Sequence, residues 1–111
     1  WAVCLKSTDE MIGDCGLTMQ KINGVILPEI GYHIAKAHQR HGYAKEAACA
    51  VRDWTFAHTP FGMVYSYMKK SNLPSSSTAR ANGMTLLDEF TDDEGEQTVV
   101  YGISRAKCCR K

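Results

Sequence analysis

The sequence predicts an α/β (α+β) fold in which helices flank a mixed, mostly antiparallel sheet. Strand-like runs joined by short turns fill the first third of the chain, and an amphipathic helix then separates them from a further strand. With 111 residues, 44% of them apolar, the chain can bury one core and leaves no room for a second. Residues 1–111 are therefore expected to form a single domain.

Three strands are predicted at the start, over residues 1–6, 11–22 and 25–34. Asn23-Gly24, between the second and third runs, is a strong signal for a two-residue hairpin turn. The pattern indicates a three-stranded antiparallel meander.

A helix is predicted over residues 44–58, where small and apolar side chains recur at helical spacing. The β-prone run 63–68 follows it after a Pro-Gly break. Because a strand comes before and after this helix, the two strands are expected to be parallel neighbours joined by a crossover.

A second, shorter helix is predicted near residues 72–83. Asn72 can cap it, Pro74 suits its first turn, and Gly83 suits its C-terminal end.

A terminal hairpin is predicted from the runs 86–90 and 98–103, which flank an acidic turn. The strand near Tyr101 is expected to lie at a sheet edge, where a second copy of the chain could pair and form a homodimer.

Composition argues against several classes of function. The net charge of +1, from 13 basic and 12 acidic residues spread along the chain, gives no basic stripe for nucleic acid. No apolar run approaches the ~20 residues that cross a bilayer, so no membrane partner is expected. The five cysteines are odd in number and show no C-x-x-C spacing, which favours a reducing, cytoplasmic location.

The turn Gln39–Ala44 leads into the first helix. Gly42 and Ala44 keep large side chains away from the backbone, and amide hydrogens at a helix start attract an anion such as pyrophosphate. A single glycine at this place also fits an ordinary turn, so the spacing alone leaves both interpretations open.

The run Pro28–Ile34, then Gln39-x-x-Gly42-x-Ala44, then Asn72-x-x-Ser75 and Gly83 resemble the GNAT superfamily in order and spacing. Glu29-Ile30-Gly31-Tyr32 looks like the branch of ribosomal-protein N-terminal acetyltransferases and their small-molecule relatives. The resemblance covers nearly the whole chain. It implies a GNAT-type sheet that lacks the family's first strand and two helices, and therefore a partial domain truncated at its N-terminus.

The implied activity is transfer of an acetyl group from acetyl-CoA to a primary amine of a protein N-terminus or small molecule. In many members a tyrosine on the second helix protonates the departing thiolate, but the second helix predicted here contains no tyrosine. A non-catalytic acyl-CoA-binding or regulatory module therefore remains the alternative. The resemblance places coenzyme A contacts on His33, Ile34, Ala35, Lys36, Gln39, Arg40, His41, Gly42, Tyr43, Ala44, Asn72 and Ser75. No metal is expected, because His38 and His41 have no third ligand at helpful spacing.

Glu29 is the predicted catalytic base, since a carboxylate on the strand that the family splays open can take a proton from the amine. An exposed carboxylate paired with a Lys or Arg is the alternative. The general acid is left among Tyr65, Tyr67 and water. Cys49 is expected to be a small core side chain, and Trp54 to pack in the core or on a sheet face.

Overall fold

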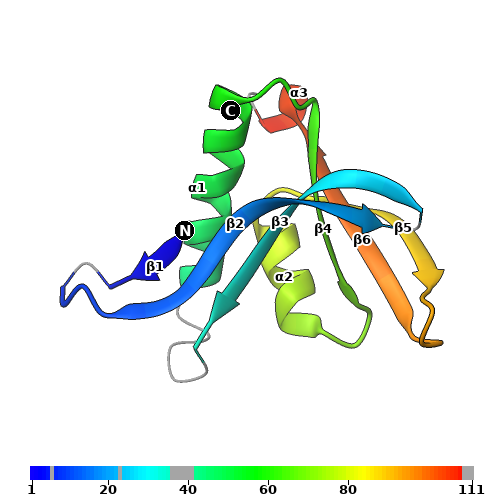
Figure 1. Ribbon diagram of the computed structural model, residues 1–111, viewed down its shortest axis with the longest axis horizontal. Helices are drawn as coiled ribbons and strands as arrows, with labels where there is room; N and C mark the ends of the chain where they lie inside the picture. Colours follow the sequence, from blue (N-terminus) through cyan, green and yellow to red (C-terminus); the bar gives the residue numbers. More distant parts are fainter. Residues whose placement is uncertain (6, 23, 36–41, 109–111) are drawn as a thin grey trace.

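The computed structural model describes residues 1–5, 7–22, 24–35 and 42–108. Six strands form one sheet in the order β1-β2-β3-β4-β6-β5 (Figure 1). The strands are β1 (Ala2–Cys4), β2 (Met11–Ile22), β3 (Val25–Ile34), β4 (Met63–Lys69), β5 (Thr85–Thr91) and β6 (Gln97–Ser104). The helices are α1 (Tyr43–His58), α2 (Leu73–Ala81) and α3 (Arg105–Cys108). The predicted mixed sheet with flanking helices is confirmed.

The β2–β3 hairpin has an unbroken antiparallel register from Gly13 opposite Ile34 to Ile22 opposite Val25. Gly24 in its turn has φ 84°, a left-handed conformation that glycine adopts without steric cost. This hairpin holds Glu29 in the middle of a long, regular ladder.

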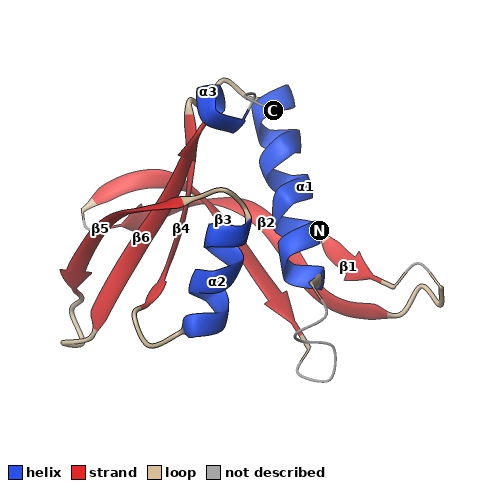
Figure 2. Cartoon of the chain, turned by 180° about the vertical axis from the view of Figure 1, so that it is seen from behind, coloured by secondary structure: helices blue, strands red, loops and turns tan. Residues whose placement is uncertain are grey.

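Both long helices lie against the same face of the sheet (Figure 2). Their small residues Ala48 and Ala79, 0% and 1% exposed, let the helices approach the sheet closely. They share one buried cluster with Ile30, Val64 and Ile103 from three of the strands. This packing fixes the helices relative to β3 and β4.

The cap of α2 forms as predicted. The Asn72 side chain accepts a hydrogen bond from the Ser75 backbone amide at 3.3 Å, and Pro74 occupies the first turn. Gly83 follows the helix with φ 84°. The end of α2 nearest to β4 therefore has a defined position.

The parallel strands β3 and β4 pair at a single register position, Glu29 opposite Tyr65. The Ser66 hydroxyl adds one link by donating to the Ile30 carbonyl oxygen at 2.8 Å. Beyond this point the strands diverge toward their C-terminal ends, with α2 beside the gap (Figure 1). The sheet is therefore splayed open where two parallel strands meet.

The fold corrects three predictions. The first strand covers only Ala2–Cys4, not residues 1–6, and the short helix α3 was not predicted. The strand that contains Tyr101 is not an edge, because β6 lies between β4 and β5 and Tyr101 is 6% exposed. That strand is therefore unavailable to a second copy. In the described part of the chain, no helix is both long enough and apolar enough to span a bilayer.

Candidate active site

A cavity of about 750 Å³ occupies the opening between β3 and β4. Its walls come from β2, β3, β4 and the beginning of α2. They are formed by Trp1, Asp14, Cys15, Gly16, Thr18, Glu29, Ile30, Gly31, Tyr32, His33, Ser66, Tyr67, Met68, Lys69, Asn72 and Ser75. Four of the residues predicted for the site, Glu29, His33, Asn72 and Ser75, thus meet around one cavity.

Glu29 lies where the two strands begin to separate. A methyl group placed on Gly31 would lie 3.3 Å from Glu29 Oε1, so the carboxylate leans over the bare backbone of Gly31. Burial raises the pKa of Glu29 to about 7, while a hydrogen bond from the Tyr67 backbone acts in the opposite direction. The ion pairs found among the described residues do not include Glu29. The structure therefore favours a half-buried carboxylate over an exposed ion-pair partner.

The opposite wall of the cavity is the first turn of α2. Besides the Asn72 cap, the carbonyl oxygen of Ser75 accepts a hydrogen bond from the Tyr32 hydroxyl at 2.9 Å. Tyr32 belongs to the motif that carries the family resemblance, yet the sequence assigned it no role. Its contact joins residues 43 positions apart, which no local pattern reveals.

Gly42 precedes α1 with φ 78° and provides no side-chain cap. A methyl group placed on it would meet no atom of the described residues within 4 Å. Tyr43 and Ala44 form the start of α1. The predicted contacts Lys36, Gln39, Arg40 and His41 lie outside the described residues.

The remaining predicted contacts lie at the end of β3. His33 is exposed and lines the cavity, whereas Ile34 and Ala35 do not. The amide of Ala35 is engaged in the sheet, where it donates to the Ile12 carbonyl oxygen at 2.6 Å. Of the two tyrosines considered as general acid, Tyr67 lines the cavity and Tyr65 does not.

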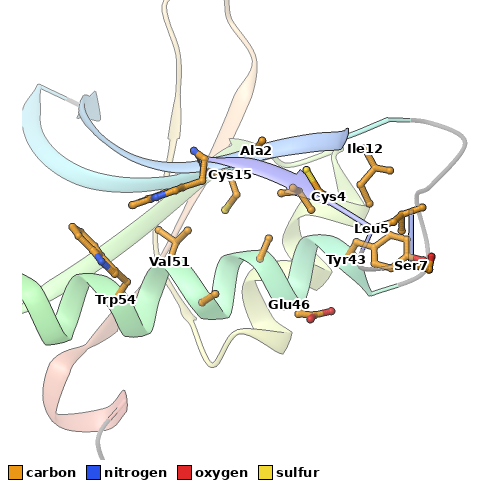
Figure 3. A pocket seen from close by; sticks show the side chains of 14 residues that line it. Ala2, Cys4, Leu5, Ser7, Ile12, Cys15, Tyr43, Glu46, Val51 and Trp54 are labelled. Carbon is orange, nitrogen blue, oxygen red and sulfur yellow. Dashed lines mark hydrogen bonds between the residues drawn. The ribbon is translucent and has the colours of Figure 1, made fainter. Parts of the chain in front are cut away.

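A second cavity, of about 660 Å³, lies between β1, β2 and α1 (Figure 3). Trp54 faces it and is 42% exposed, so of the two places expected for this side chain, the core or a sheet face, the core is wrong. Its ring meets the edge of Trp1, with centroids 5.3 Å apart, and stacks on His58 at 4.8 Å. This cavity has mainly apolar walls and shares Trp1 and Cys15 with the cavity between β3 and β4.

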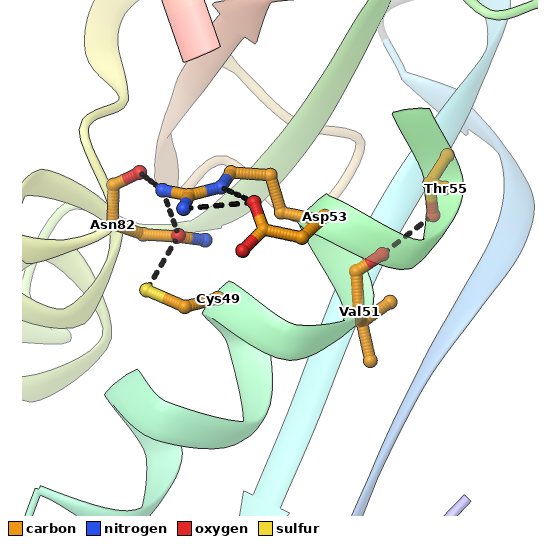
Figure 4. Close-up of polar contacts among 6 residues, drawn as sticks. Cys49, Val51, Asp53, Thr55 and Asn82 are labelled. Carbon is orange, nitrogen blue, oxygen red and sulfur yellow. Dashed lines mark hydrogen bonds and ion pairs between the residues drawn. The ribbon is translucent and has the colours of Figure 1, made fainter. Parts of the chain in front are cut away.

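A polar network ties α1 to the end of α2 (Figure 4). Arg52 Nη1 donates to both oxygens of Asn82, at 2.7 and 2.9 Å, and the Cys49 thiol donates to Asn82 Oδ1 at 3.0 Å. Asn82 is 1% exposed, so these partners satisfy its buried oxygens. Cys49 is therefore a half-buried side chain with a polar partner and not the core side chain that the sequence predicted.

Metal-ligating side chains do not gather in groups of three or more anywhere in the described ranges. His38 and His41, which were weighed as ligands, lie outside those ranges.

Residues 1–85 match the acetyltransferase (GNAT) domain family. The chain belongs to the GNAT acetyltransferases. The Bacillus subtilis protein YkkB is 37% identical over 84 residues, which cover 76% of this chain and 49% of YkkB. The chain thus spans about half of this relative's length.

Solved structures agree with this assignment. An acetyltransferase from Agrobacterium tumefaciens superposes with a TM-score of 0.75 and 31% identity, covering 92% of this chain and 58% of the other. A ribosomal L7/L12 alpha-N-protein acetyltransferase in complex with coenzyme A gives a TM-score of 0.72 at 20% identity, covering 86% of this chain and 56% of the other. At 20% identity, the likeness to the L7/L12 acetyltransferase shows a shared fold.

Proposed function

We propose that the protein containing this GNAT chain transfers an acetyl group from acetyl-CoA to a primary amine of a protein N-terminus or small molecule. The observation that carries the proposal is Glu29, a half-buried carboxylate with a pKa near 7 at the start of the β3–β4 opening. A base whose pKa lies near the working pH combines a large ionised fraction with useful basicity. An ion-paired surface carboxylate, with a pKa near 4, would be a much weaker base.

In the proposed reaction the amine nitrogen forms a bond to the acetyl carbon as the bond from that carbon to sulfur breaks. The nitrogen must lose a proton, and the Glu29 carboxylate accepts it directly or through one water. An α-amino group has a pKa of about 7.7–8.0, close enough to that of Glu29 for this transfer. The departing sulfur takes its proton from water or from Tyr67, which lines the same cavity.

Coenzyme A is proposed to bind with its pyrophosphate at Gly42 and its thioester arm in the opening. The start of the 16-residue helix α1 suits an anion, because first-turn amides and the helix dipole both attract it. Among the described residues, no atom lies within 4 Å of a methyl group placed on Gly42. Asn72 and Ser75 border the cavity on the side of α2 and would contact the arm. The family assignment and the coenzyme A complex of the L7/L12 acetyltransferase support this interpretation.

A cytoplasmic location is part of the proposal. Cys4, Cys15 and Cys49 are free thiols, as expected where glutathione keeps cysteines reduced.

Glu29→Gln in the full-length protein tests the function, with Glu89→Gln as the matched control. Glu89 is a carboxylate on β5 that pairs with Lys70, away from the cavity. For Glu29→Gln we expect turnover of an amine substrate to fall about 10²- to 10⁴-fold, with acetyl-CoA affinity within about twofold of wild type. Glu89→Gln should leave both unchanged.

Two results would contradict the proposal. Undiminished turnover in Glu29→Gln would remove this residue from the mechanism. A wild-type protein that binds acetyl-CoA but acetylates none of a panel of peptide N-termini and small amines would instead support the non-catalytic module.

A further inference from the structure

The width of the opening is not set by the β3–β4 ladder. That ladder contributes the single pair Glu29–Tyr65. Two side-chain bonds add to it: the Ser66 hydroxyl donates to the Ile30 carbonyl oxygen, and the Tyr67 backbone donates to the Glu29 carboxylate. Past Ile30 the strands separate, and the first turn of α2 lines the cavity together with the last residues of β4. The buried Ala79 places the body of α2 on the sheet, so the question is which contact holds the first turn of α2, at the cavity, at its distance from β3.

Tyr32 makes such a contact. It lies two residues beyond Ile30, its ring packs against the core cluster, and its hydroxyl donates to the Ser75 carbonyl oxygen at 2.9 Å. Ser75 in turn donates its amide to Asn72 Oδ1 at 3.3 Å. Through this chain of bonds, Tyr32 restrains both α2 residues that border the cavity.

The Tyr32 hydroxyl can keep its hydrogen bond to Ser75 over a wide range of pH. Burial raises the pKa of Tyr32 to about 12, although its bond to Ser75 acts in the opposite direction. The phenol therefore stays protonated, and able to donate, over the whole range in which Glu29 titrates.

We infer that Tyr32 is a positioning residue, which fixes the first turn of α2 against β3 and so sets the width of the opening. The inference rests on the proposed function, because the width matters for catalysis only if the thioester arm enters there. Tyr32 does not need to touch the reacting atoms, since it acts through Asn72 and Ser75.

Tyr32→Phe in the full-length protein tests this inference, because it keeps the packed ring and removes only the hydroxyl. Tyr101→Phe is the matched control: its hydroxyl contacts Arg80 Nη1 at 3.1 Å, near the other end of α2 and outside the cavity. For Tyr32→Phe we expect KM for acetyl-CoA to rise about 3- to 10-fold, as loss of one hydrogen bond allows, with the pH midpoint of turnover unchanged. Amide exchange in the first turn of α2 should accelerate in the ligand-free protein. Tyr101→Phe should leave KM and this exchange within about twofold of wild type.

A Tyr32→Phe protein whose KM and first-turn exchange match those of Tyr101→Phe would overturn the inference. So would a lower melting temperature with unchanged KM, because that result describes a purely structural role. Failure of the proposed function gives a different result: the wild type would then show no turnover, while exchange in α2 would still report whether Tyr32 holds the helix.

Discussion

Replacing Glu29 with Gln is expected to stabilise the fold at alkaline pH while it abolishes the proposed base. The carboxyl group has a pKa of about 7 in the folded protein against 4.5 for a solvated glutamate. Below 4.5 both states are protonated. Between these values the unfolded state loses its proton first, so the stability of the wild type falls as pH rises toward 7 and stays reduced above it. Gln cannot ionise and avoids this loss.

The full shift would correspond to about 3 kcal/mol. Because the side chain is only partly buried, solvent screening reduces the expected effect to about 1–2 kcal/mol. Denaturant unfolding of full-length wild type, Glu29→Gln and Glu89→Gln at pH 5 and pH 8 measures it. Because part of the loss has already occurred at pH 5, the advantage of Glu29→Gln over wild type should widen by about half to three quarters of that amount between the two pH values, and Glu89→Gln should show no such change. An advantage that is equal at both pH values would refute the buried-carboxylate reasoning.

Substitutions at two glycines, each compared with a second glycine as its control, provide further predictions. A methyl group on Gly13 would overlap the backbone carbonyl oxygen of His33, whereas one on Gly16 finds no atom nearer than 3.9 Å. Gly13→Ala should therefore lower the free energy of unfolding by about 2–3 kcal/mol, and Gly16→Ala by less than about 0.5 kcal/mol. Denaturant unfolding measures both values, and equal losses would contradict the strand geometry. Gly42→Glu should weaken acetyl-CoA binding about 100-fold in calorimetric titration, because its carboxylate would repel the pyrophosphate. Gly24→Glu imposes the same left-handed strain at a distant turn, so equal binding by the two variants would rule out Gly42 as the phosphate site.

Local pattern was sufficient to predict most elements of the fold. The apolar spacing of residues 44–58, the cap at Asn72 and the turn glycine Gly24 each depend on neighbours in the chain, and each appears as predicted. Strand order was harder to predict. The terminal hairpin satisfies its pattern whichever of its strands pairs with β4, and the structure places β6 there.

In the candidate site, too, features that depend on local sequence could be predicted, and features that depend on tertiary contacts could not. The position of Glu29 on a strand could be predicted, but its burial depends on β4, whose partner residue Tyr65 lies 36 positions later. The contact of Tyr32 with Ser75 depends on where α2 packs. Trp54 was expected to pack in the core or on a sheet face, yet its ring is 42% exposed and faces the cavity between β1, β2 and α1. In each case the missing information is a tertiary contact.

The pH dependence of kcat/KM for amine acetylation by the full-length protein tests the central claim most directly. If Glu29 is the base, wild-type activity should rise with pH through an ionisation near 7, and Glu29→Gln should lose this ionisation along with most of the activity. A Glu29→Gln protein that keeps the same ionisation with undiminished activity would show that another group removes the proton.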